Sequence, residues 1–186
     1  MGHANQRQWV LEAVDRHELG LLRYALRLVG EEGLARDAVQ HAFLKLWDDV
    51  GSDRWQEHAA SPPGGRDLLA AWLFRVCRNR CLDHLRTEGR EQPLDALPSP
   101  GREIDPAEAA ESDELAACLR ELVARLPAAQ REAIDLWCEG FRYGEIGEIT
   151  GHKEGHVRVL VHRGLARVRE APQVRAWLSE EQAPAQ

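Results

Sequence analysis

A run of acidic residues divides the chain into two parts, and this division limits the folds that the chain can adopt. Residues 91–114 contain eight acidic residues and one basic residue, a local charge of −7 that equals the formal net charge of the whole chain. The stretch from 89 to 109 is rich in proline, glycine and acid, a composition typical of an extended linker. We therefore expect two modules, residues 1–88 and 111–186, joined by an acidic linker over residues 89–110.

Apolar residues in both modules recur three and four positions apart, which predicts amphipathic helices, and no convincing strand pattern is present. With 186 residues, 44% of them hydrophobic, the chain can form one ordinary domain or two small helical ones. We predict an all-α fold of two small helical domains. The helices are expected at about 6–29, 34–50, 67–87, from Ser112 onward, at 154–170 and after Pro172, with a loop over 51–65 and breaks at Pro127, Gly140 and Gly151.

The second module contains a pattern typical of a helix-turn-helix. Gly147 lies where two helices would cross, Gly151 would supply the turn, and Val157 would lock the second helix onto the first. The alternative is a pair of helices joined by a glycine turn without any role in DNA binding.

The helix after this turn has two chemically different faces. An apolar face is expected to meet the core through Val157, Leu160, Val161, Leu165 and Val168. The opposite face would meet a major groove through Arg158, Val159, His162, Arg163, Ala166 and Arg169. Arg158 could contact a base edge or a phosphate, whereas Arg163 and Arg169 are better placed for phosphates. Val159 could pack on a thymine methyl group or be an ordinary surface valine.

The third helix of the first module carries a basic stripe with an aromatic residue at its edge, Trp72. The stripe falls within about 100° of arc and consists of Arg75, Arg78, Asn79 and Arg86. Arginines that neutralise phosphate beside an aromatic side chain suit a nucleic-acid strand whose bases are unstacked. The alternative is a solvated basic face with a tryptophan in the core.

Other classes of function have little support in the sequence. Phosphate-cradling glycine loops and nucleophile motifs are missing, so we expect neither an enzyme nor a cofactor. Cys77, Cys81 and His84 share a helix, but no fourth zinc ligand is evident nearby, so no metal is expected. All four cysteines are expected to be buried free thiols. No apolar run could span a membrane and no signal peptide is visible, so we expect no membrane insertion.

Three stretches in this order resemble the extracytoplasmic-function subfamily of bacterial RNA polymerase sigma factors. Residues 37–47 are similar to that family's polymerase-docking helix, residues 71–86 to its promoter-melting helix, and residues 126–167 to its upstream-element reader. The resemblance covers about residues 17–170. It implies a cytoplasmic protein that binds core RNA polymerase, at the β′ clamp and the β flap, and directs it to promoter DNA. An anti-sigma factor is a further possible partner, and the acidic linker would partly imitate RNA in the polymerase cleft.

The resemblance also implies roles for individual residues. Polymerase docking would involve Val39, Gln40, Phe43, Leu44 and Trp47. The minus-10 element, where a base is flipped from the nontemplate strand, would be met by Trp72, Arg75, Arg78, Asn79 and Arg86. The minus-35 element would be met by Lys153, His156, Arg158, Val159, His162 and Arg163.

The sequence departs from the family pattern at several of these positions. His41 stands where the family usually has Glu, Lys153 where a helix-capping Ser or Thr is usual, and Leu160 where a basic residue is common. His156 and Val159 also replace common residues, and the loop over 51–65 is longer than is typical. These differences predict a divergent upstream element. Two rival hypotheses stay open, a dimeric helix-turn-helix regulator that acts without polymerase and a sigma-like scaffold that no longer binds promoters.

Overall fold

The computed structural model describes residues 3–50, 68–87 and 114–181, and the regular elements within these ranges are all helices. The first module consists of α1 (His3–Val29), α2 (Glu32–Asp49) and α3 (Leu68–Thr87). The second consists of α4 (Glu114–Ala124), α5 (Ala128–Cys138), α6 (Tyr143–Thr150), α7 (Glu154–Glu170) and α8 (Pro172–Glu181). The expected all-α fold is thus confirmed. The linker over 89–110, the loop over 51–65 and the proposed cap at Ser112 lie outside the described residues.

The helix breaks fall where the sequence predicts them. Pro127 separates α4 from α5, Gly140 follows α5, and Gly151 separates α6 from α7. The expected helix over 154–170 matches α7, and the expected tail helix is α8. Proline and glycine therefore mark these boundaries in the sequence.

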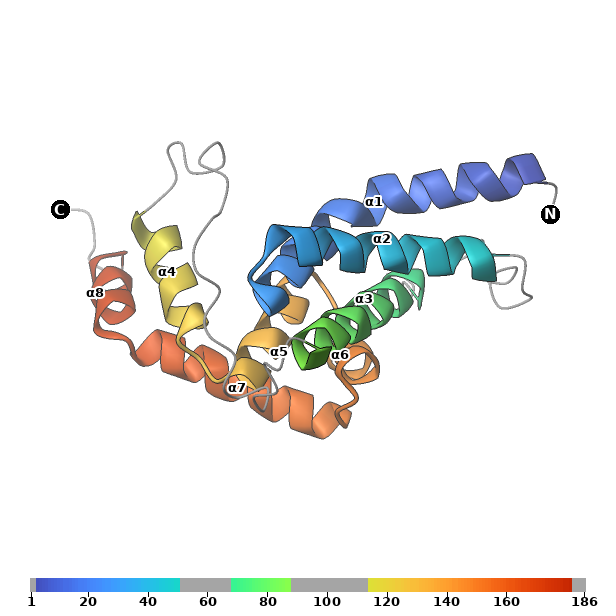
Figure 1. Ribbon diagram of the computed structural model, residues 1–186. Coiled ribbons are helices and arrows are strands. Elements are labelled where there is room, and N and C mark those ends of the chain that lie inside the picture. Colours follow the sequence, from blue (N-terminus) through green and yellow to red (C-terminus); the bar gives the residue numbers. More distant parts are fainter. Residues whose placement is uncertain (1–2, 51–67, 88–113, 182–186) are drawn as a thin grey trace.

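In the first module, α1 and α2 lie side by side and α3 packs against both of them (Figure 1). Ala35, Ala38 and Ala42 are fully buried on α2, and their small side chains let the neighbouring helices approach closely. Larger apolar side chains, among them Leu21, Leu46 and Leu73, fill the centre without exposed surface.

The two modules pack directly on each other, which the sequence did not predict. One continuous core includes Leu73 and Phe74 of α3 together with Phe141, Ile146 and Val157 of the second module. The rings of Phe74 and Phe141 meet edge to face with centroids 4.8 Å apart. A smaller second core, formed by Leu126, Ile134, Val168 and Val174, holds α8 onto the remainder of its module.

The prediction that all four cysteines are buried is wrong in part. Cys77 and Cys81 are fully buried in α3, but Cys118 is partly exposed and Cys138 is exposed. The apolar pattern of α5 misleads at Cys138 because this residue lies at the last position of its helix, where the core no longer covers it. All four thiols are free. Among the helices that the structure describes, none is both long enough and apolar enough to cross a membrane.

Burial raises the pKa of one carboxyl group at the contact between the modules. Asp135 of α5 lies 3.3 Å from the Arg27 guanidinium of α1, measured from Oδ1 to Nη1. Burial raises the pKa of Asp135 from 3.8 to about 6, against the opposing effect of Arg27 and Arg131 and with a smaller contribution from Glu132 and Glu139. The folded protein therefore holds this proton more tightly than the unfolded chain does.

This raised pKa predicts a specific pH dependence of stability. Because the folded state binds the Asp135 proton more tightly, this group makes the free energy of unfolding fall as the pH rises from about 4 to about 6. Asp135→Asn should remove that component, so wild type should lose about 2 kcal/mol more than the variant between pH 4 and pH 7. Urea unfolding of both proteins at several pH values measures this difference. Parallel pH profiles would contradict it.

Candidate nucleic-acid interface

The helix-turn-helix has the geometry that its sequence predicts. Gly151 adopts a left-handed conformation with φ of +82°, and its N–H donates to the Gly147 carbonyl at 2.9 Å. A Cβ atom at Gly147 would lie 2.6 Å from the His152 carbonyl oxygen, so only glycine allows the two helices to cross this closely. Val157 is completely buried beneath the crossing. All three predicted positions of the motif are confirmed as structural positions.

The outward face of α7 exposes the predicted upstream-element residues. All six are exposed, namely Lys153, His156, Arg158, Val159, His162 and Arg163. The predicted core side is also confirmed, since Val157, Leu160, Val161 and Val168 are buried and Leu165 is half-buried. Of the other two outward residues, Arg169 is exposed and Ala166 is half-buried. Lys153 stands at the N-cap without a side-chain hydrogen bond to the helix, because the lysine side chain has no acceptor for the free backbone N–H groups.

Arg158 contacts two neighbours, and sequence reasoning identified neither of them as its partner. Its guanidinium lies 5.6 Å from the centroid of the Tyr143 ring, at the start of α6. Its Nη2 also donates to Glu154 Oε1 at 3.4 Å, one turn earlier on α7. Beside this pair, the rings of His152 and His156 meet edge to face at 5.0 Å. The signal for Tyr143 was present in the sequence, as an aromatic residue at the first position of the motif.

The basic stripe of α3 is only partly a surface feature. Arg75, Asn79 and Arg86 are exposed, and Trp72 is half-buried at the edge as expected. Arg78 differs, because its side chain is only 10% exposed. On the helical wheel Arg78 lies at one end of the predicted arc, so it turns toward the second module instead of toward solvent.

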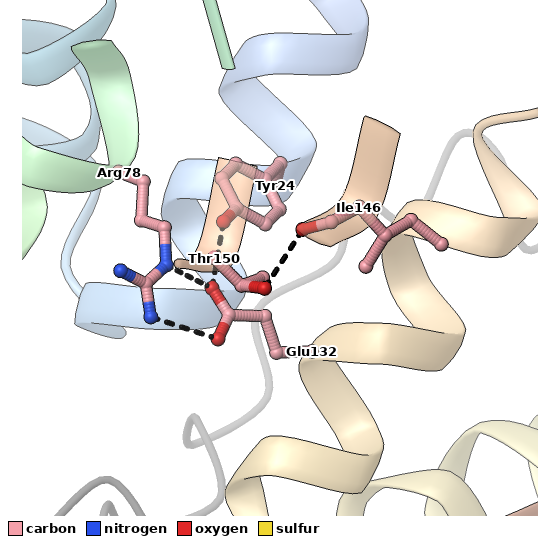
Figure 2. Close-up of polar contacts among 5 residues, drawn as sticks. All are labelled: Tyr24, Arg78, Glu132, Ile146 and Thr150. Carbon is pink, nitrogen blue, oxygen red and sulfur yellow. Dashed lines mark hydrogen bonds and ion pairs between the residues drawn. The ribbon is translucent and has the colours of Figure 1, made fainter. Parts of the chain in front are cut away.

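Arg78 is bound by a buried carboxylate of α5, as Figure 2 shows. Its Nε donates to Glu132 Oε1 at 2.7 Å and its Nη2 donates to Glu132 Oε2 at 3.2 Å. The Tyr24 hydroxyl of α1 donates to the same Oε1 at 2.7 Å. Burial, followed by the charge of Glu132, raises the pKa of Tyr24 well above its usual value. Burial opposes the charge of Arg78, but the Glu132 carboxylate outweighs it and raises the pKa of that guanidinium.

A second ionic cluster joins α3 to α2. Asp37 Oδ2 accepts hydrogen bonds from Arg80 at 3.0 Å and from His84 at 2.8 Å. The hydrogen bond from His84, followed by those from Arg80, lowers the pKa of Asp37 although burial opposes the shift. This cluster links the two helices that carry the predicted docking and melting residues. His84 thus contacts a carboxylate rather than joining Cys77 and Cys81.

The predicted docking residues on α2 divide between core and surface. Val39 is buried and Phe43 is half-buried, so both pack within the first module. Gln40, Leu44 and Trp47 are exposed, and Leu44 exposes 57% of its surface. Leu44 and Trp47 are three residues apart on one helix, and Trp47 exposes 45% of its surface. Together they form an exposed apolar edge that is suited to binding another protein.

Comparison with known proteins assigns both modules to one family. The model of Sigma-70 region 2 matches residues 13–91, and that of Sigma-70 region 4 matches residues 116–168. RNA polymerase sigma factor CarQ of Myxococcus xanthus is 31% identical over 159 residues, which cover 83% of this chain and 84% of CarQ. ECF RNA polymerase sigma factor SigL of Mycobacterium tuberculosis is 30% identical over 163 residues, with the same two coverages.

The chain belongs to the ECF sigma factors. Region 2 of this sigma factor corresponds to α1, α2 and α3, and region 4 corresponds to the helices from α4 to α7. ECF RNA polymerase sigma factor SigE of Mycolicibacterium smegmatis is 32% identical over 165 residues, but the chain spans only 60% of that relative's length.

Solved structures of sigma factors share the fold. RpoE in complex with the anti-sigma factor NepR, from Bartonella quintana, is 28% identical and superposes with a TM-score of 0.60, covering 86% of this sigma factor and 95% of that chain. CnrH in complex with the cytosolic domain of CnrY is 20% identical with a TM-score of 0.58, which supports the fold.

Proposed function

We propose that this sigma factor binds core RNA polymerase in the bacterial cytoplasm and directs it to promoters, where it helps to open the DNA. The observation that carries the proposal is the presence on one chain of an exposed apolar edge on α2 and a complete helix-turn-helix with five exposed residues on α7 and a sixth, Lys153, at its N-cap. The first would hold polymerase at its β′ clamp and the second would read the minus-35 element. The β flap and promoter DNA complete the proposed set of partners, and an anti-sigma factor would compete with them.

The exposed residues of α3 complete the proposed mechanism. Arg75 and Arg86 would neutralise the phosphates of a separated strand, Asn79 would hydrogen-bond to that strand, and Trp72 would stack on an unpaired base. Polymerase supplies the chemistry of nucleotide addition, so the sigma factor contributes binding and positioning.

The scaffold alternative loses one of its two supports. Leu160, which stands where a basic residue is common, lies on the buried side of α7 and packs in the core, so packing explains its apolar character. Lys153 adds an exposed cation to the reading face, which favours DNA binding. The regulator alternative gives no role to the exposed apolar edge of α2.

The docking proposal predicts that Leu44→Ser combined with Trp47→Ser weakens binding to core polymerase by at least about tenfold. A few residues at the centre of a protein interface, often tryptophans, contribute about 2 kcal/mol or more each. Leu19→Ser is a matched control, since Leu19 on α1 is 60% exposed and lies outside the proposed site. Competition between labelled wild type and each variant for core polymerase measures the effect. Equal loss in variant and control would contradict docking through α2.

A further inference from the structure

Tyr143, the first residue of α6, contacts both the protein core and the outward face of α7. Its side chain is half-buried and packs against the larger hydrophobic core. On α7, the guanidinium carbon of Arg158 lies over the Tyr143 ring, 5.6 Å from the ring centroid. The ring therefore joins the first helix of the helix-turn-helix to an exposed residue of the second.

The start of α6, from which Tyr143 projects, is held by a buried carboxylate. Glu145 Oε2 accepts a hydrogen bond from the backbone N–H of Arg142 at 2.8 Å, and Glu145 is only 6% exposed. A carboxylate three residues into a helix that binds back to the N-cap in this way satisfies a backbone donor and fixes the first turn. The Tyr143 ring thus has an ordered backbone behind it and the core beneath it.

The backbone of Arg158 is equally well fixed, whereas its side chain is not. Val157, the preceding residue, is completely buried, so packing sets the rotation at which α7 presents Arg158. The Arg158 side chain is 66% exposed, and its 3.4 Å contact with Glu154 is a solvent-exposed ion pair of little strength. Because an arginine side chain loses rotamer freedom when it binds DNA, a ring that restricts it beforehand lowers the cost of binding.

The position of Arg158 on α7 favours a base edge over a phosphate as its target. Arg158 is the fifth residue of α7, and the N-terminal residues of a recognition helix are those that contact base edges. A guanidinium that lies over an aromatic ring keeps the N–H groups along its edge available. Two such N–H groups bind O6 and N7 of guanine together, which requires a defined orientation of the guanidinium.

We propose that Tyr143 is a positioning residue for base recognition, whose ring orients Arg158 toward a guanine of the minus-35 element. Tyr143 acts through Arg158 and makes no contact of its own with the base. The proposal rests on the proposed function, because it assigns a determinant of sequence specificity to the same reading surface.

The affinities of the holoenzyme for a set of promoter duplexes test this role. Minus-35 sequences are selected with the wild-type holoenzyme, each base pair is then replaced in turn, and competition gel shifts give the loss of affinity for each replacement. We expect Arg158→Ala to lose about tenfold discrimination at one G·C pair. Tyr143→Leu keeps the apolar bulk but lacks the ring, so it should lose about threefold discrimination at that same pair.

Two further variants show whether the ring itself is responsible. Tyr143→Phe keeps the ring and should restore most of the discrimination that Tyr143→Leu loses. Trp177→Leu is the matched control for loss of an aromatic side chain, because Trp177 is 41% exposed on α8, outside the helix-turn-helix. The control should discriminate as wild type does at every base pair.

A double-mutant cycle distinguishes positioning from a direct contact with DNA. In the Arg158→Ala background, Tyr143→Leu should cause no further loss of discrimination, since no guanidinium is left to orient. An equal loss in both backgrounds, or a Tyr143→Phe variant as weak as Tyr143→Leu, would overturn the proposal, and so would an Arg158→Ala variant that discriminates fully.

Arg158→Lys provides a test that does not depend on the folding of the Tyr143→Leu variant. Lysine keeps the positive charge but lacks the planar fork of N–H groups, so discrimination at the same G·C pair should fall as far as in Arg158→Ala. Full discrimination by Arg158→Lys would show that a point charge is sufficient, and the orienting role of Tyr143 would be overturned.

Binding of wild type to core polymerase separates this proposal from the proposed function. If polymerase binds and the two substitutions are additive, the sigma function stands and the positioning role is wrong. If polymerase does not bind, duplexes are selected with the full-length chain alone and the same cycle is measured. Coupling between Tyr143 and Arg158 would then support the positioning role without the sigma function, and failure to select any duplex would overturn both.

Discussion

Replacement of Arg158 and Arg163 by alanine together is expected to reduce promoter-dependent transcription by about 100-fold. Both guanidinium groups are exposed on the outward face of α7, and each lost contact to a base or a phosphate should cost about 1–3 kcal/mol. The relevant measurement is run-off transcription by core polymerase and the variant, from promoters selected with the wild-type holoenzyme.

The control for this pair is a double replacement of Arg120 and Arg125. These two arginines are also exposed on the second module, but Arg120 lies on α4 and Arg125 directly follows it, so neither lies on the reading face. Their loss removes the same two positive charges as the Arg158 and Arg163 replacement. Because these arginines lie outside the reading face, transcription should stay within about threefold of wild type. Full activity of the Arg158 and Arg163 variant would favour the scaffold hypothesis over promoter reading.

Gly147→Ala is expected to destabilise the helix-turn-helix by about 2 kcal/mol and to abolish minus-35 recognition. The new methyl group would lie 2.6 Å from the His152 carbonyl oxygen, a backbone atom that cannot rotate away. The turn between α6 and α7 would have to open, which would tilt the reading face of α7. Urea unfolding gives the loss of stability, and gel-shift binding to a selected promoter duplex gives the loss of recognition.

Gly155→Ala is the matched substitution for this prediction. Gly155 lies in the first turn of α7, and a Cβ atom there meets no other atom within 4 Å. Alanine is favoured over glycine in a helix by up to about 1 kcal/mol, so this variant should be as stable as wild type or more stable. A similar loss of stability in both variants would mean that the crossing at Gly147 is not as close as the structure indicates.

The parts of the fold that depend on local chemistry could be predicted from the sequence. Pro127 and Gly151 end helices through their own backbone properties, and the periodicity of α7 determines which side of that helix is buried. The reading face of α7 follows from the same pattern, which is why all six predicted residues there are exposed.

The contact between the modules could not be predicted in this way. A helical wheel places Arg78 beside Arg75 and Asn79, but it carries no information about a carboxylate more than fifty residues away. Glu132 reads as an ordinary surface acid in the sequence, yet its side chain is almost completely buried. Tertiary packing determines both outcomes, because the contacts of Phe74 with Tyr24 and with Phe141 bring the two modules together.

The same limit applies to the docking helix. The family resemblance groups Val39 with Leu44 as docking residues, but Val39 is buried and Leu44 is exposed. Both residues are apolar, and five positions on a helix put them about 140° apart, but it is the packing of α1 and α3 against α2 that decides which of the two faces is the core. The role of the exposed residues in polymerase binding stays a prediction.

The most direct test of the central claim is native mass spectrometry of the purified full-length chain mixed with bacterial core RNA polymerase. The protein should be confirmed as folded by circular dichroism and free of bound inhibitor. The account predicts a one-to-one complex. A folded chain that does not bind core polymerase at micromolar concentration would contradict the account, and the stand-alone helix-turn-helix regulator would then become the leading hypothesis.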